Sequence, residues 1–131
     1  MIYLDANFFI FAAFDAGKKG DHARMILAEI IHGRKAVTSA LAIDEVMWVF
    51  KRNKFAGNLR STVEEIYTIR NLEVKEVSAL IPIRALDFIE RFALKPRDAF
   101  HASIMSELGI TDIVSDDSDF DKISGLKRIV V

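Results

Sequence analysis

The sequence predicts an α/β fold, a three-layer α/β/α sandwich in which helices cover both faces of a mainly parallel sheet. Short apolar segments typical of buried strands recur along the chain, at residues 2–4, 35–38, 72–77, 112–115 and 128–131. Segments with helical periodicity or helix-capping residues separate them. Strands that alternate with helices form βα units, and such units build parallel sheets covered on both faces.

The first half of the predicted fold begins with a buried strand, Ile2–Leu4, which stops at Asp5. Residues 8–14 follow as a short helix that is apolar on nearly every side. Asp21 is a suitable N-cap for a helix that runs to residue 32, with Gly33 at its C-terminal stop. These features predict one strand and two helices before the second strand.

The remaining helices are marked by caps, apolar stripes and prolines. Thr38 or Ser39 caps a helix that runs to about residue 51. A helix at 79–92 must accept Pro82 in its first turn, and a helix that starts at Pro96 ends at Gly109. One more helix is indicated by an apolar stripe of Leu59, Val63, Ile66 and Tyr67.

Composition and charge limit the class of protein. The 131 residues are 51% hydrophobic and 28% charged, which fits one globular domain over 1–131. The longest apolar stretch is too short to span a bilayer, the N-terminus does not resemble a secretory signal, and cysteine is absent. We therefore expect a cytoplasmic protein with no membrane segment. A net charge of −1 argues against nucleic-acid binding by bulk electrostatics alone.

Carboxylates follow two of the predicted strands. Asp5 ends the first strand, and three further acids follow the strand that ends at Ser115: Asp116, Asp117 and Asp119. Ligands of open parallel sheets bind at the carboxyl ends of the strands, where such acids would meet. Crowded carboxylates are costly unless a cation compensates their charge. Taken alone, Asp5 fits a helix cap as well as it fits a metal ligand.

Other acids and one histidine lie on predicted helices. Asp44 and Glu45 are neighbours in an otherwise apolar run, and they point about 100° apart on a helix. Either one of them faces solvent and the other a polar pocket, or both lie at the edge of a solvated stripe, which is the commoner arrangement for such pairs. Asp98 lies in the first turn after Pro96, where the helix dipole alone would stabilise an acid. His101 lies on the same helical face as Asp98, and its role is structural or supports the site indirectly.

The combination of these motifs is more informative than any one of them. Their order and spacing are Asp5 with Asn7, then Ser39 with Glu45, then Asp98–Ala102, then Ser115–Phe120. In this order the chain resembles the PIN-domain ribonucleases, particularly the small VapC-type toxins of VapBC toxin–antitoxin pairs. The resemblance covers essentially the whole chain, and it implies a five-stranded, mainly parallel sheet.

The resemblance also implies roles for individual residues. The catalytic acids would be Asp5, Glu45, Asp98 and Asp117, and the metal ligands would include Asp5, Asp98, Asp117 and Asp119. Which of Asp116, Asp117 and Asp119 is the fourth ligand stays open. Ala6 stands where the family often has Thr. Supporting roles around the ligands are expected for Asn7, Ser115 and His101.

The activity implied by the resemblance is hydrolysis of RNA phosphodiester bonds in single-stranded or loop RNA, leaving a 5′-phosphate. The cofactor would be Mg²⁺ or Mn²⁺, because hard cations prefer oxygen ligands. Independently of the resemblance, a basic run close to the end of the helix that carries Glu45 fits RNA contact as well as it fits an ordinary solvated surface: Lys51, Arg52, Lys54 and Arg60.

Two rival functions remain at this stage. One is a PIN-like binding module without catalysis, because a fold does not prove an activity. The other is a Mg²⁺-dependent phosphohydrolase on a similar sheet. A haloacid-dehalogenase-like enzyme would need a second Asp two residues after Asp5, where this chain has Asn7.

Large apolar side chains are numerous for so small a chain. They occur in residues 8–14 and around the end of a later helix, at Trp48, Phe50 and Phe55. Large exposed apolar patches usually mark interfaces, although neighbouring helices can also cover such rings. Together with the resemblance, this excess predicts a homodimer and an apolar surface that receives an antitoxin protein.

Overall fold

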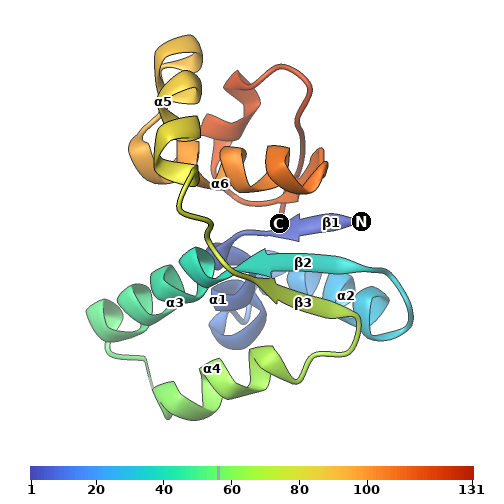
Figure 1. Ribbon diagram of the computed structural model, residues 1–131. Helices are drawn as coiled ribbons and strands as arrows, with labels where there is room; N and C mark the ends of the chain where they lie inside the picture. The colour runs from blue at the N-terminus through green and yellow to red at the C-terminus, as the bar shows by residue number, and fades with distance from the viewer. Residues whose placement is uncertain (56) are drawn as a thin grey trace.

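The computed structural model describes residues 1–55 and 57–131 (Figure 1). Its elements, in chain order, are β1 (Ile2–Leu4), α1 (Ala6–Phe14), α2 (Lys18–Ile31), β2 (Ala36–Ser39), α3 (Ala40–Asn53), α4 (Leu59–Tyr67), β3 (Leu72–Lys75), α5 (Ile81–Phe92), α6 (Pro96–Leu108), β4 (Asp112–Val114), the 3₁₀ helix η1 (Ser118–Lys122) and β5 (Lys127–Ile129). The predicted alternation of strands and helices is confirmed.

Within the described residues the strands form a five-stranded sheet in the order β3-β2-β1-β4-β5, and every pair is parallel. Tyr3 of the central strand pairs with Val37 of β2 on one side and with Ile113 of β4 on the other. The chain therefore builds the sheet outward from β1 in both directions. The switch point lies between the carboxyl ends of β1 and β4, where α/β proteins bind ligands.

Helices cover both faces of the sheet, as the sequence predicts. Helices α1 to α4 lie on one side in Figure 1, and α5 and α6 lie on the other. Along β1, Ile2 and Leu4 pack toward the first group, whereas Tyr3 packs toward α5 and α6. This alternation follows from the two-residue period of a strand, and it produces a three-layer sandwich.

Several predicted boundaries need correction. The second helix begins at Lys18 rather than at Asp21, which lies in its first turn. Asp15 explains the earlier start, because its carboxylate accepts hydrogen bonds from the backbone N–H groups of Gly17 and Gly20. The third strand ends at Lys75 rather than at residue 77. The helix ends at Pro82 and Gly109 are as predicted: Pro82 lies in the first turn of α5, and Gly109 caps α6 with φ 70°.

The aromatic residues do not form one exposed patch. Phe8 and Phe9 of α1 are buried, and the Phe14 ring stacks on that of Phe55 with centroids 4.3 Å apart. The Phe50 ring packs edge-on against both Phe14 and Phe55. Along the rest of α1, Ile10 to Ala12 are only partly buried and Ala13 is exposed. None of the described helices combines the length and apolarity needed to cross a membrane.

Candidate metal centre

Asp5 is buried where the central strand ends, with 5% of its surface exposed. It is also the N-cap of α1, because its Oδ1 accepts from the backbone N–H of Ala6 at 2.8 Å. Its Oδ2 accepts from the Ser115 hydroxyl at 2.7 Å and from the Asn7 amide at 3.3 Å. The two roles left open for Asp5, helix cap and member of a polar site, are therefore compatible.

Ser115 and Asn7 connect Asp5 to the loop after β4. The hydroxyl of Ser115 accepts from the backbone N–H of Asp117 at 3.0 Å, and Asn7 Oδ1 accepts from the backbone N–H of Asp116 at 3.2 Å. Both residues therefore lie between Asp5 and the acidic loop.

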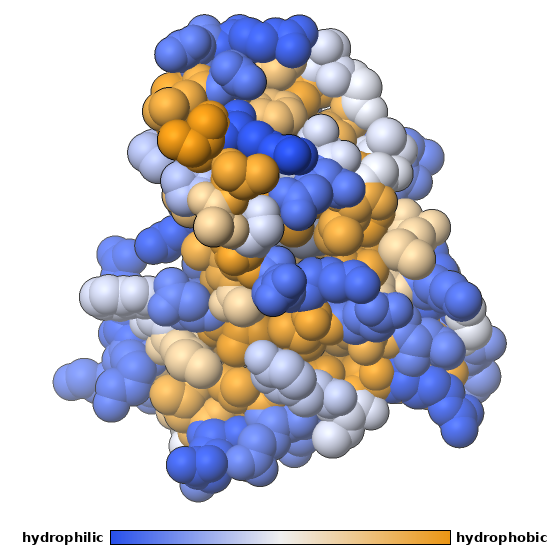
Figure 2. Space-filling view, viewed as in Figure 1, coloured by the Kyte–Doolittle hydropathy of each residue, from blue (hydrophilic) through white to orange (hydrophobic). Residues whose placement is uncertain are grey.

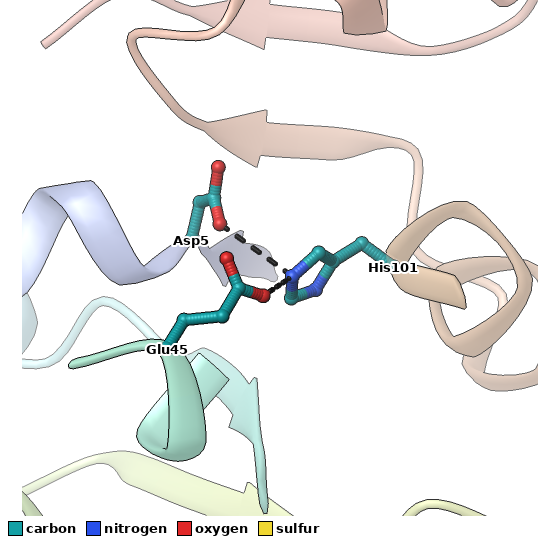
Figure 3. Close-up of side chains that lie close together, drawn as sticks. All are labelled: Asp5, Glu45 and His101. Atoms are coloured by element: carbon teal, nitrogen blue, oxygen red, sulfur yellow. Dashed lines mark hydrogen bonds and ion pairs between the residues drawn. The ribbon is translucent and has the colours of Figure 1, made fainter. Parts of the chain in front are cut away.

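Glu45 of α3 points toward Asp5 and His101 of α6, whereas its neighbour Asp44 is exposed to solvent (Figure 3). Nε2 of His101 hydrogen-bonds to Glu45 and lies 3.7 Å from Asp5 Oδ1. Burial is the largest influence on the pKa of His101 and lowers it, but the bond to Glu45 and the nearby carboxylates outweigh this effect. The pKa of His101 is therefore raised.

A second group of acids forms where α6 begins and η1 follows β4. Asp98, Asp117 and Asp119 offer carboxylate oxygens that lie within 4.8 Å of one another. Burial raises the pKa of Asp98 to about 6, and the negative charges of Asp117, Asp119 and Asp5 contribute further. The effect of Asp5 shows that both groups belong to one electrostatic environment.

The loop acids that the sequence leaves open are separated by the structure. Asp117 and Asp119 join the group around Asp98, whereas Asp116 accepts a 2.7 Å hydrogen bond from Lys19 of α2 and lies outside the clusters found in the described chain. Lys122 lies 3.3 Å from Asp119. These two lysines partly neutralise the edges of the acidic loop.

The donor set fits a hard divalent cation. Carboxylate oxygens dominate both groups, Asp5 with Glu45 and Asp98 with Asp117 and Asp119. Mg²⁺ and Mn²⁺ prefer oxygen ligands. Burial and, after it, the charges of neighbouring acids raise the pKa of Asp98, and a bound cation would offset those charges. The candidate acids that the sequence indicates are thus brought together, although they lie on four separate segments of the chain.

The predicted basic run lies at a distance from the acidic groups. Lys51 follows Glu45 by six residues on α3, which corresponds to about 9 Å along the helix axis. Lys51 and Arg52 are in the last turn of α3, and Lys54 is its C-cap. Arg60 of α4 pairs with Glu64 at 3.3 Å. The side chains are exposed, which leaves their role in RNA binding a prediction.

Sequence reasoning missed several residues around the site. Tyr3 is buried with its hydroxyl 2.7 Å from Nδ1 of His101, and Thr38 Oγ1 donates to the carbonyl of Leu4 at 2.8 Å, which ties β2 to the end of β1. Lys19 was also missed. In the sequence, most of these residues are accounted for as members of an apolar strand or as a helix cap. No local pattern therefore predicts their polar contacts across the sheet.

The PIN domain family model matches residues 2–126. The fold is similar to that of VapC20 from Mycobacterium tuberculosis, a sarcin–ricin loop cleaving toxin, with TM-score 0.73, 19% identity and coverage of 92% of this chain and 93% of that one. It is also similar to VapBC2 from Rickettsia felis bound to a promoter DNA fragment, with TM-score 0.75, 18% identity and coverage of 99% of this chain and 98% of that one. A toxin–antitoxin complex from Klebsiella pneumoniae is similar too, with TM-score 0.74, 18% identity and coverage of 97% of this chain and 96% of that one. No curated protein matches the chain by sequence.

The raised pKa of Asp98 predicts how pH affects the metal-free protein. A carboxyl with a folded pKa of about 6, above its ordinary 3.8, stabilises the fold most below pH 3.8, and this contribution is lost as the pH rises through about 6. We expect Asp98→Asn to be more stable than wild type at pH 7, by on the order of 1 kcal/mol after allowance for the solvent exposure of Asp98, and the gap to close below pH 5.

Urea unfolding in chelator at a series of pH values measures this difference. Asp21→Asn is the control, because Asp21 is exposed on α2 and pairs with Arg24. A constant gap between wild type and Asp98→Asn from pH 4 to pH 7 would contradict the prediction.

Proposed function

Because this chain belongs to the PIN domain family, we propose that it is a divalent-metal-dependent ribonuclease and the toxin of a toxin–antitoxin pair. The observation that carries the proposal is the convergence of five acids at the carboxyl edge of the sheet, beside the switch point between β1 and β4. They are Asp5, Glu45, Asp98, Asp117 and Asp119. The similar structures, which include a toxin that cleaves the sarcin–ricin loop, support the same activity.

In this proposal the acids hold Mg²⁺ or Mn²⁺. When bound, such an ion supplies Lewis-acid chemistry: it offsets charge on the phosphate and makes water a stronger nucleophile. Asp98, Asp117 and Asp119 would hold the ion through their carboxylate oxygens, and Asp5 and Glu45 would complete the acidic edge. Ser115 and Asn7 hold the carboxylate of Asp5 in place. The products would be RNA fragments, one of which carries a 5′-phosphate.

The rival readings are less well supported by the site. A binding module without catalysis would not need several acids at close range, because crowded carboxylates cost stability; burial and, after it, the charges of neighbouring acids raise the pKa of Asp98. For a phosphohydrolase that uses an Asp pair two residues apart, the second position is Asn7, and its amide donates to Asp5 and Ser115. It therefore acts as a support for Asp5 and offers no second carboxylate.

The first test of the function replaces ligands by their amides. Asp5→Asn and Asp98→Asn should each lower metal-dependent RNA cleavage by at least about 100-fold, since even residues that only orient ligands are worth 10–100-fold. The fold should survive, because removing one charge from a crowded acidic site relieves repulsion. Cleavage is measured on structured RNA with Mg²⁺ or Mn²⁺, and folding by thermal unfolding.

Two neighbours of the proposed ligands serve as matched controls. Asp44→Asn changes an exposed acid next to Glu45, and Asp116→Asn changes a loop acid that pairs with Lys19. Both variants should cleave like wild type. Near-normal cleavage by a folded Asp5→Asn protein would rule out the proposed metal centre.

RNA contacts are proposed for the exposed basic run, Lys51, Arg52, Lys54 and Arg60. Neutralising these four residues should weaken RNA binding and flatten its dependence on salt, because fewer counterions are released. Affinity for Mn²⁺ should not change. Binding of the substrate RNA to a cleavage-deficient Asp98→Asn background, measured from low to high salt, gives the slope.

A matched control neutralises Lys35 and Lys127 instead. These residues precede or begin strands β2 and β5, so they lie at the amino edge of the sheet, opposite the acids. A slope that responds to the Lys35 and Lys127 changes and not to the basic run would place the RNA elsewhere.

An antitoxin site is proposed in an apolar groove of about 230 Å³ between α1, α2 and α4, lined by Phe8, Phe9, Ala12, Ala13, Leu27, Thr62, Glu65, Ile66 and Ile69. Figure 2 shows an apolar area between α4 and the sheet. The occupant would be an amphipathic helix of the antitoxin, whose apolar face fits such a groove. Toxin–antitoxin complexes among the similar structures support this partner.

The change Ala13→Arg tests the groove. Ala13 is exposed on α1, so an arginine there should leave the fold intact and block the apolar face of a partner helix. We expect the product of an adjacent reading frame to bind wild type and protect RNA from it, and to lose both effects with Ala13→Arg. Lys18→Arg, at the start of the next helix, is the control. Equal protection from both variants would exclude this groove.

A homodimer is proposed through apolar side chains that the monomer leaves uncovered. Leu80, the N-cap of α5, and Ile83 and Leu86 within it are 57%, 66% and 50% exposed, and Trp48 of α3 is 63% exposed. Figure 2 shows apolar side chains gathered over α5. Phe50 and Phe55, which the sequence groups with Trp48, pack against Phe14 within the monomer and leave Trp48 as the exposed member of that group.

Light scattering at micromolar concentration decides the oligomeric state. Wild type should have the mass of a dimer, and Ile83→Glu should shift it to a monomer, since a buried unpaired charge is costly at an interface. Met25→Glu on α2 is the control, because Met25 is 54% exposed outside this surface. A monomeric wild type would show that the apolar residues of α5 do not serve a dimer.

A further inference from the structure

A chain of buried hydrogen bonds leads from the central strand to the proposed metal centre. The Tyr3 hydroxyl lies 2.7 Å from the Ser39 hydroxyl and 2.7 Å from Nδ1 of His101. The other ring nitrogen of His101, Nε2, bonds to Glu45 (Figure 3). Tyr3, Ser39 and His101 have 0%, 0% and 1% of their surfaces exposed. These hydrogen bonds thus connect residues of β2, β1, α6 and α3 and end at Glu45, one of the acids.

The direction of these hydrogen bonds follows from counting protons. Ser39 Oγ accepts from the backbone N–H of Ala42, so its own proton needs an acceptor, and among the described residues that acceptor is the Tyr3 oxygen. The Tyr3 proton then points at Nδ1 of a neutral His101 ring, which leaves the ring proton on Nε2. In a charged ring both nitrogens carry protons. In either state Nε2–H donates to Glu45.

Packing alone does not explain the hydroxyl of Tyr3. Its ring lies against apolar residues of α5 and α6, a role that Phe would fill equally well. A buried hydroxyl costs free energy unless it is hydrogen-bonded, and here it bonds to two polar groups. Burial also raises the pKa of Tyr3, so the hydroxyl keeps its proton and remains able to donate.

We propose that Tyr3 is a positioning residue of the metal centre: its hydroxyl holds the His101 ring so that Nε2–H orients the Glu45 carboxylate toward the bound cation. This inference rests on the proposed function. It assigns His101 as a hydrogen-bond donor to a ligand, although its Nε2 lies close enough to Asp5 and Glu45 to suggest a ligand. A nitrogen that carries a proton cannot bind a metal, so the ligand set consists of oxygens, which suits Mg²⁺ and Mn²⁺.

The experiment compares Tyr3→Phe with Thr38→Val. Both changes remove one buried hydroxyl between β1 and β2, but the Thr38 hydroxyl donates to the carbonyl of Leu4 rather than toward His101. Mn²⁺ affinity is measured by calorimetry, without RNA. Tyr3→Phe should bind Mn²⁺ about 10–100-fold more weakly than wild type, the usual effect of losing a residue that orients a ligand. Thr38→Val should bind like wild type.

Nitrogen NMR of the His101 ring adds a readout that a general loss of stability would not change. In wild type, without metal and with Mg²⁺, Nε2 should carry a proton, and Nδ1 of the neutral ring should show the shift of a hydrogen-bonded acceptor. In Tyr3→Phe the Nδ1 resonance should move to that of an unbonded acceptor, and in Thr38→Val it should not move. The wild-type spectra need no variant, so they decide the point even if Tyr3→Phe does not fold.

Two results would overturn the inference: a Mg²⁺-bound wild type in which Nε2 has lost its proton, or a folded Tyr3→Phe protein with unchanged Mn²⁺ affinity and an unchanged Nδ1 resonance. A failure of the proposed function looks different. In that case wild type itself binds neither Mn²⁺ nor Mg²⁺, while the spectra of the metal-free ring still show whether Tyr3 holds Nδ1.

Discussion

The buried carboxylate of Asp5 is the feature on which the rest of the site depends. It ends the central strand, starts α1 through the N–H of Ala6, and accepts the Ser115 hydroxyl from the end of β4. A charged group at 5% exposure is stable only if its oxygens are well bonded. Each bond to Asp5 therefore also fixes a segment of backbone: the start of α1 on one side and the loop after β4 on the other.

This arrangement explains why the acids gather at one edge without sharing a sequence motif. The parallel sheet brings the ends of β1 and β4 together, which places Asp5 beside the loop of Asp117 and Asp119. Helix α6 then crosses the same edge with Asp98 in its first turn and His101 one turn later. Burial and, in addition, the negative charges of these acids raise the pKa of Asp98. Stability is thus given up at the place where the proposed function needs charge.

The sequence predicts the layers, the parallel sheet and most helix ends, because strand alternation, prolines and glycine caps act locally. The helix pattern does not distinguish Glu45 from Asp44, because both residues fit it. Only the resemblance to the family favours Glu45. The sequence does not predict contacts between segments that are far apart along the chain. Nothing local to Tyr3 shows that its hydroxyl meets a histidine 98 residues later, or that Lys19 pairs with Asp116. The start of α2 was misplaced for a similar reason, because Asp15 caps it from outside the helix.

The two-residue period of β1 gives the last connection. Tyr3 and Asp5 are two positions apart, and Asp5 keeps an extended backbone (φ −77°, ψ 163°), so both side chains face α6. One histidine of α6 can therefore meet both, Tyr3 at Nδ1 and Asp5 at 3.7 Å from Nε2. Shifting the strand by one residue would turn Ile2 and Leu4 toward α6 instead and remove every polar contact at once. The register that buries the core thus also sets the orientation of the imidazole beside the acids.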